Sequence, residues 1–148
     1  MTNHTLIARE QAIQAEFETL PDVDAKYTHL FRLAESLPPL DPALKTEANR
    51  VHGCQSSLWF HLDCNASGLH LAAESDSLVI SGIAALLIHL VEGCQPEDLD
   101  HLNLNFVDQM GIWKLPSARN NSLAAMLDHL KTSARNLPDG QDRNHPNA

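Results

Sequence analysis

Basic residues are scarce in this chain of 148 residues, which has 10 Lys and Arg against 19 Asp and Glu and a formal net charge of −9 at pH 7. No Lys/Arg cluster is available to meet phosphate groups, so nucleic-acid or membrane partners are not expected. Long hydrophobic runs are also lacking, because no apolar stretch reaches the length that spans a bilayer. The first residues lack a basic start followed by an apolar run. We therefore expect a soluble, cytoplasmic protein.

Cysteines are few as well. The three, Cys54, Cys64 and Cys94, cannot all pair within one chain, and their spacing is unlike a secreted disulfide framework. At least one of them is therefore a free thiol. Histidines are frequent, with nine in the chain, but they are scattered along it, so a metal site has to be weighed residue by residue.

The length fits one domain with a single core. We expect this domain to cover residues 1–136. Residues 137–148 are polar and rich in turn formers, which predicts a flexible C-terminal tail.

Helical spacing of apolar residues and capping residues predict most of the secondary structure. Asp22 or Asp24 is suited to cap the second helix, and the prolines within 37–42 end it. The segment 77–92 is apolar nearly all round, which is typical of a central core helix. Helices are predicted over residues 5–20, 22–36, 77–92, a short stretch after Pro96, 106–112, and a last segment that follows the polar run 117–122.

Two segments alternate as half-buried strands, 57–64 and 69–74, and the turn formers of 65–68 separate them. They predict an antiparallel hairpin. A third strand is possible just before Cys54 or around 102–104. Helices before and after the hairpin indicate an α+β fold, in which a small antiparallel sheet packs against a layer of helices.

Cys54 stands apart from the other two cysteines. It follows Gly53 in a turn, just before the alternating segment, so its thiol is expected where side chains face solvent and the backbone changes direction. A nucleophilic or sulfur-carrying cysteine requires such a place. Cys64 continues the apolar face of its strand and is expected in the core. Cys94 follows Gly93 in a turn and is expected to be an exposed bystander.

Two other functions remain open at this level. His52, Cys54, His61 and Cys64, with His70 nearby, are residue types that bind zinc. Strand alternation places His61 and Cys64 on opposite faces, however, and no Cys-x2-Cys pair is present. Cys54 with His52 is also compatible with a thiol hydrolase or transferase, although no third, orienting residue is evident.

Several motifs together resemble the SufE family of sulfur-acceptor proteins in iron–sulfur cluster assembly. The similarity extends over roughly residues 10–133 in the same order. It is carried by residues 37–51, by Gly53-Cys54-Gln55-Ser56 with Trp59, by Ser75-Asp76 before a helix containing Gly82, and by Arg119 followed by Leu123-Ala124-Ala125-Met126.

The resemblance implies mixed helices around a small antiparallel sheet, as the residue patterns do. It also implies that Cys54 accepts sulfane sulfur from the persulfide of a pyridoxal-phosphate-dependent cysteine desulfurase. The chain would stimulate that enzyme and pass the sulfur to an iron–sulfur scaffold or another acceptor. It would act with the desulfurase, not as a free-standing enzyme, and would bind no cofactor of its own.

By the same resemblance, Asp76 and Arg119 are positions near the acceptor loop. Helix capping for Asp76 and a surface salt bridge for Arg119 are the structural alternatives. Gly53 is expected to be one hinge of the loop. Transfer requires a Cys54 thiolate, and adjacent His52 is hypothesised to lower the pKa of Cys54. In the free protein we expect the Cys54 side chain to tuck toward Trp59.

Overall fold

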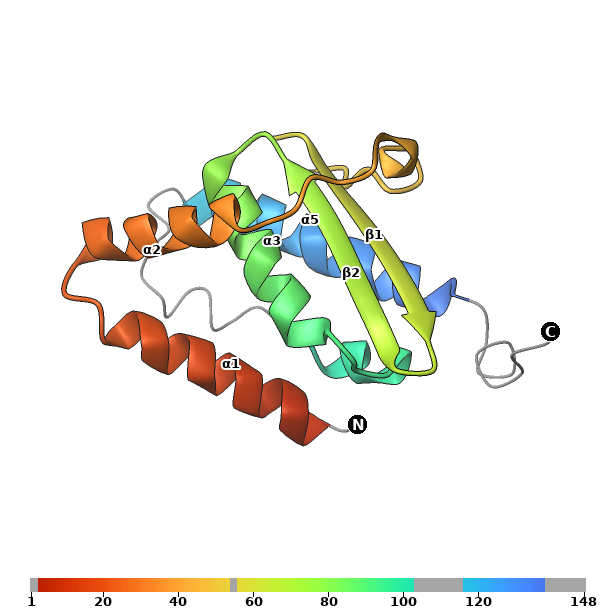
Figure 1. The fold of residues 1–148 in the computed structure, drawn as a ribbon, viewed down its shortest axis with the longest axis horizontal. Coiled ribbons are helices and arrows are strands. Elements are labelled where there is room, and N and C mark those ends of the chain that lie inside the picture. Colours follow the sequence, from red (N-terminus) through yellow and green to blue (C-terminus); the bar gives the residue numbers. More distant parts are fainter. Residues whose placement is uncertain (1–2, 54–55, 103–115, 138–148) are drawn as a thin grey trace.

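The computed structural model describes residues 3–53, 56–102 and 116–137, without the side chains of residues 3–4 and 116–121. Helices flank a single hairpin, which confirms the predicted α+β fold (Figure 1). No helix within these described ranges is long and apolar enough to cross a membrane. The elements in chain order are α1 (Asn3–Glu18), α2 (Val23–Glu35), the 3₁₀ helix η1 (Pro42–Leu44), β1 (Leu58–Asn65), β2 (Gly68–Ser75), α3 (Leu78–Val91), the 3₁₀ helix η2 (Pro96–His101) and α5 (Pro116–Arg135).

The predicted hairpin is confirmed: β1 and β2 pair antiparallel, with Leu58 opposite Ser75 and Asn65 opposite Gly68. A possible third strand before Cys54 proves to be one isolated bridge between Arg50 and Trp59. The other position considered, 102–104, lies almost wholly outside the described residues. The sheet is therefore two-stranded in the described part of the chain.

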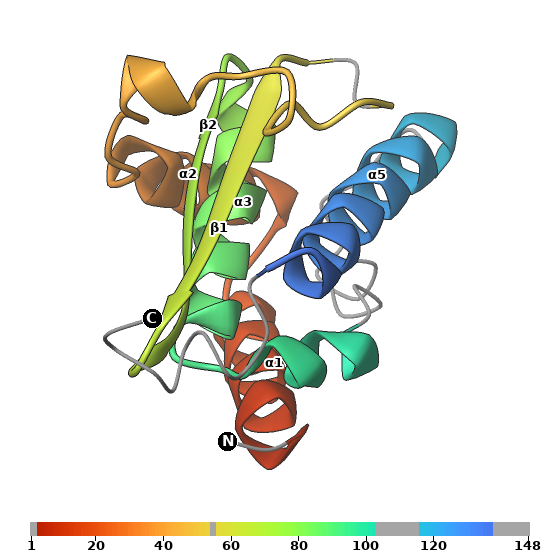
Figure 2. The same cartoon turned by 90° about the vertical axis from the view of Figure 1, so that its right-hand side faces the viewer.

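One face of the hairpin is buried. Its inward side chains alternate with more exposed ones, because successive residues of a strand point to opposite faces. Helix α3 packs against β2, and α5 packs against β1 (Figure 2). The buried side chains of the hairpin are Leu58, Phe60, Leu62, Leu69, Leu71 and Ala73.

Helix α3 is the central core helix that its composition predicts, with nine of its residues buried. Ser77 caps it by accepting a hydrogen bond from the Ile80 amide at 3.3 Å. It also lies unusually close to α2 at Gly82, where an added Cβ would come within 2.5 Å of the Leu30 carbonyl oxygen. Only glycine allows that approach, so Gly82 determines how closely the two helices cross.

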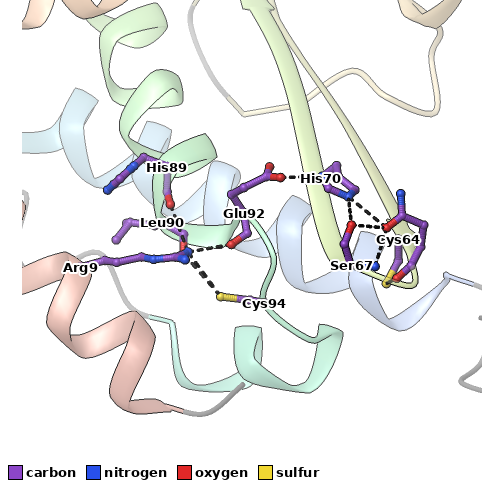
Figure 3. A network of polar contacts seen from close by, with 9 residues as sticks. Arg9, Cys64, Ser67, His70, His89, Leu90, Glu92 and Cys94 are labelled. Carbon is purple, nitrogen blue, oxygen red and sulfur yellow. Dashed lines mark hydrogen bonds and ion pairs between the residues drawn. The ribbon is translucent and has the colours of Figure 1, made fainter.

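The C-terminal end of α3 is capped from α1, across more than 80 residues of sequence. Arg9 Nη1 donates to the carbonyl oxygens of Leu90 at 2.9 Å and Glu92 at 2.8 Å, and approaches that of His89 at 3.2 Å (Figure 3). The last carbonyls of a helix have no partner within it and carry a partial negative charge. The Arg9 guanidinium group donates hydrogen bonds to these carbonyls, and its positive charge lies beside their partial negative charge.

The same end of α3 holds the turn of the hairpin. His70 Nδ1 lies 2.7 Å from Glu92 Oε2, and His70 Nε2 lies 3.1 Å from Asn65 Oδ1. Ser67 closes this network, since its hydroxyl donates to Asn65 Oδ1 at 2.7 Å (Figure 3). Both ring nitrogens of His70 are therefore occupied.

The prediction of an exposed Cys94 is wrong, because its exposed fraction is 0%. The chain after α3 pairs with the start of β2: the Gly93 amide donates to the Leu69 carbonyl and the Leu69 amide to the Cys94 carbonyl, both at 2.8 Å. This pairing turns the thiol inward. Burial raises the pKa of Cys94, although nearby Arg9 partly opposes that effect. Such a thiol is a poor nucleophile.

Some boundaries also differ from expectation. Helix α5 begins at Pro116 and so includes the polar run 117–122, which was expected to precede it. Proline is well suited to a first helical turn, where its missing N–H is not needed. The predicted helix at 106–112 lies outside the described residues. So does the predicted tail, apart from Leu137, which packs against the core.

Candidate functional site

The segment that carries Cys54 leaves and rejoins the fold at one point. The Val51 amide donates to the Leu58 carbonyl at 2.8 Å, and the Phe60 amide donates to the Asn49 carbonyl at 2.9 Å. We call residues 52–57 the acceptor loop. Cys54 and Gln55 lie outside the described residues, so the described frame of this loop is its two ends.

Asp76 holds the returning end of the acceptor loop. Its Oδ1 accepts a hydrogen bond from the Ser57 amide at 3.1 Å, and its own amide donates to the Ser57 carbonyl at 3.3 Å. The helix cap of α3 is Ser77. Asp76 is therefore bound to the loop, not to the start of the helix.

Gly53 lies at the other end of the loop, with a φ of +92°. Residues with a side chain rarely adopt this backbone conformation. A Cβ added at Gly53 would also lie 3.2 Å from the Ala125 Cβ of α5, which is a tight contact. Both observations favour glycine here and place this end of the loop against α5.

Trp59 follows the loop on the outer face of β1. The Arg50 guanidinium carbon lies 5.2 Å from its ring centroid and Lys45 Nζ lies 5.5 Å from it, so two cations flank the ring. Lys45 also pairs with Glu74, and the hydrogen bond from Lys45 lowers the pKa of that carboxyl group. The expected packing of Cys54 on Trp59 concerns a side chain outside the described residues and stays a prediction.

His52 is exposed, and its Nε2 lies 2.6 Å from Glu47 Oε2. The imidazole thus has a carboxylate partner of its own. Its hypothesised effect on the pKa of Cys54 stays a prediction. Arg119 lies within α5, and its side chain is outside the described part of the chain.

His129 on α5 is a residue that sequence analysis missed. It lines a small pocket beside His52, and its Nε2 is buried without a hydrogen-bond partner. Its ring meets Phe60 edge to face, with centroids 6.1 Å apart. A signal did exist, because His129 lies next to Leu130 and three residues after Met126, both of which are buried.

The described residues among those weighed for zinc do not gather into one site. His61 Nδ1 lies 3.3 Å from the Asn49 side-chain amide, whereas Cys64 points to the apolar face, half-buried as expected. His70 belongs to the network at the hairpin turn. No group of three or more His, Cys, Asp or Glu that could hold a metal is found among residues 3–53, 56–102 and 116–137.

Comparison with known proteins matches this fold and this loop. A family model described as "SufE: Fe-S metabolism associated domain" matches residues 11–134. The chain is 31% identical over 129 residues to "SufE-like protein 1, chloroplastic/mitochondrial" of Arabidopsis thaliana, in a match that covers 86% of this chain and 35% of that protein. This chain thus spans about a third of that relative's length.

A solved structure is similar over most of its length. The solution structure of a hypothetical protein from Thermus thermophilus matches with a TM-score of 0.71 and 25% sequence identity. The match covers 86% of this chain and 93% of that one. Because the family model covers most of the chain and includes the acceptor loop, this protein belongs to the SufE family, whose domain is associated with Fe–S metabolism.

Proposed function

We propose that this protein is a sulfur acceptor that carries sulfane sulfur as a persulfide on Cys54. The donor is the persulfide of a pyridoxal-phosphate-dependent cysteine desulfurase, which the chain also stimulates. The recipient is an iron–sulfur scaffold or another sulfur acceptor. The chain acts in the cytoplasm, binds no cofactor of its own and works only together with the desulfurase.

The environments of Cys64 and Cys94, together with the family motif around Cys54, carry this proposal. Cys94 is fully buried, and its pKa is raised. Cys64 packs against the core from β1, with Sγ 3.8 Å from the Asn65 carbonyl oxygen. Sulfur transfer requires an accessible thiolate, which the buried Cys94 does not offer and which the half-buried Cys64 offers less readily than a loop cysteine. Cys54 is the remaining cysteine, and it lies in the loop that carries the family motif.

The frame of the acceptor loop supports the same role. Its ends are fixed by main-chain hydrogen bonds and by Asp76, while Gly53 provides a backbone conformation that other residues rarely adopt. These contacts fix where the segment with the family motif leaves and rejoins the fold. The net charge of −9 suits a desulfurase with a basic docking rim.

The test is intact-mass analysis after incubation with a cysteine desulfurase, pyridoxal phosphate and L-cysteine. We expect one adduct with the mass of a sulfur atom, which reductant removes. Cys54→Ser should abolish it, whereas Cys64→Ser and Cys94→Ser should retain it. An adduct that persists in Cys54→Ser would refute the assignment. Stoichiometric zinc without any adduct would instead indicate the metal-binding alternative.

A further inference from the structure

Two cations flank an aromatic ring where the chain enters and leaves the acceptor loop. The Arg50 guanidinium carbon lies 5.2 Å from the Trp59 ring centroid, and Lys45 Nζ lies 5.5 Å from it. Arg50 and Trp59 also form a main-chain β-bridge. The backbone therefore places the arginine beside the ring. We call Lys45, Arg50 and Trp59 the cationic patch.

Arg50 keeps its hydrogen-bond donors for an outside partner. In the described part of the chain, its guanidinium forms no ion pair with an acidic side chain. Nearby carboxylates are already used: Glu47 pairs with His52, and Glu74 pairs with Lys45. An aromatic ring offers no oxygen, so the N–H groups of Arg50 remain available. A guanidinium of this kind is suited to bind a carboxylate through two parallel hydrogen bonds.

The cationic patch is accessible and differs in sign from the rest of the protein. Arg50 and Trp59 are half-buried, and Lys45 is exposed. The chain as a whole has 10 Lys and Arg against 19 Asp and Glu. Tryptophan and arginine are the residues that most often dominate the binding energy of protein interfaces. An accessible pair of these residues in an acidic protein indicates a contact for an acidic group of a partner.

The cationic patch also lies within reach of a protein that exchanges sulfur with Cys54. Arg50 precedes Cys54 by four residues, which span at most about 14 Å whatever path the loop takes. A standard interface buries about 800 Å² on each partner, which corresponds to a disc with a radius of about 16 Å. Sulfur transfer requires the two sulfur atoms to come within bonding distance. A donor centred on Cys54 is therefore large enough to cover Arg50.

We propose that Arg50, supported by Trp59, binds an acidic side chain of the cysteine desulfurase during sulfur loading; this inference rests on the proposed function. The net charge of −9 favours a basic rim on that partner. A carboxylate opposite Arg50 then fixes the orientation in which the partner docks. Lys45 contributes less, because Glu74 already neutralises it. Arg50 is a docking residue and takes no part in the exchange of sulfur bonds.

The first test measures the dissociation constant between the full chain and a pyridoxal-phosphate-loaded desulfurase that loads the wild type. Arg50→Gln should weaken binding at least about tenfold, because it removes one partner of a charge-assisted pair. Arg50→Lys should recover only part of the loss, since an ammonium group keeps the charge but not the fork of donors. Salt should weaken wild-type binding more steeply than that of Arg50→Gln. Equal affinity of Arg50→Gln and wild type would overturn the proposal.

Lys131→Gln is the matched control for net charge. It removes one positive charge from α5, where Lys131 Nζ lies 3.5 Å from the Asp100 carbonyl oxygen in η2, beyond the end of α3. Its affinity for the desulfurase should stay within about twofold of wild type, because the charge is distant from the loop and screened. Urea denaturation of Arg50→Gln checks that the variant is folded. An equal loss of affinity in both variants would reduce the effect to net charge and contradict the proposal.

A cross-linking experiment identifies the group that Arg50 meets. In Arg50→Lys, carbodiimide couples the new amine at position 50 to a carboxylate in contact with it. We expect mass spectrometry of the complex to show the peptide that contains position 50 joined to an acidic residue of the desulfurase. A complex in which position 50 links only to carboxylates of its own chain would overturn the proposal.

Loading kinetics separate this inference from the proposed function. Arg50→Gln should raise the desulfurase concentration that half-saturates sulfur loading, while the rate at saturation stays within about twofold of wild type. If Cys54→Ser abolishes loading but Arg50→Gln binds and loads as wild type does, the proposed function survives and this inference fails. If Arg50→Gln slows only the delivery of sulfur to a scaffold, the cationic patch serves the recipient, and this inference also fails. If Cys54→Ser still accepts sulfur while Arg50→Gln binds weakly, the docking contact stands and the proposed function fails.

Discussion

The two ends of the β1–β2 hairpin use the same residue types in opposite ways. At the turn end, His70 is bound on both ring nitrogens, Glu92 joins it to α3, and Arg9 caps that helix (Figure 3). At the loop end, His129 has a buried nitrogen without a partner and faces a pocket. A fully paired polar group stabilises a fold, and an unpaired one retains chemical capacity.

The cysteines follow the same division. Cys64 and Cys94 lie toward the turn end, where Cys64 packs half-buried against the core and Cys94 is buried at the end of α3. Cys54 belongs to the loop end, whose described frame is fixed only at its flanks. The comparison implies that substitutions at the turn end reduce stability, whereas those at the loop end change reactivity.

The largest effect on stability is expected at Arg9. Arg9→Ala removes the guanidinium that binds the carbonyl groups of His89 and Leu90 in α3 and of Glu92, which follows the helix. We expect a loss of about 2 kcal/mol in the free energy of unfolding, measured by urea denaturation. Arg9→Lys should recover part of it, because a single ammonium group keeps the charge but not the fork of donors. Equal stability of Arg9→Ala and wild type would contradict the capping role.

Gly53→Ala should affect both the stability of the fold and the rate of sulfur loading. The φ of +92° and the 3.2 Å approach to Ala125 predict a loss of about 1–2 kcal/mol in stability. Slower sulfur loading should accompany it, because the loop can no longer hold its position against α5. In an Ala125→Gly background the contact is relieved but the backbone cost remains, so only part of the stability should return. Full recovery would show that the contact, not the conformation, matters.

A smaller effect on stability is expected for substitution of His70. His70→Ala removes the link between Glu92 and Asn65. Because this network is partly exposed, we expect a loss of about 1 kcal/mol by chemical denaturation, with sulfur loading unchanged. Impaired loading in a folded His70→Ala protein would break the division between the two ends.

The smallest expected effect is the contribution of His129 to the pH dependence of stability. Its pKa is lowered in the folded state, chiefly by burial, so between the folded and unfolded pKa values only the unfolded chain binds this proton. Stability should therefore fall as the pH drops below about 6.5. His129→Gln should show a shallower decline in denaturation curves between about pH 7 and pH 5 than wild type does. Thr132→Val, in the same pocket, should decline as wild type does, and a shallower decline there would point away from His129.

Local sequence patterns were sufficient to predict much of the fold. Alternation located both strands and the buried face of the hairpin. Of the two capping residues considered for α2, Asp22 and Asp24, the structure uses Asp22, and α3 begins after its cap Ser77, where the predicted helix 77–92 starts. The motif around Gly53 and Cys54 identified the family before any geometry was known. These features depend on residues close together in the sequence.

The features that were missed depend on distant partners. Cys94 was expected to be exposed because nothing local shows that Leu69 pairs with it. Arg9 looks like an ordinary residue of a surface helix until the end of α3, more than 80 residues later, lies beside it. His129 has the same character, since its hydrogen bond to Phe60 and the pocket beside His52 arise only on packing.

The central claim is best tested where both ends compete within one wild-type molecule. After a single turnover with a cysteine desulfurase, persulfide occupancy is measured for each cysteine-containing peptide by mass spectrometry. We expect the persulfide on the Cys54 peptide and background levels on those of Cys64 and Cys94. A persulfide on Cys64 or Cys94 with Cys54 unmodified would place the reactive thiol elsewhere and contradict this account.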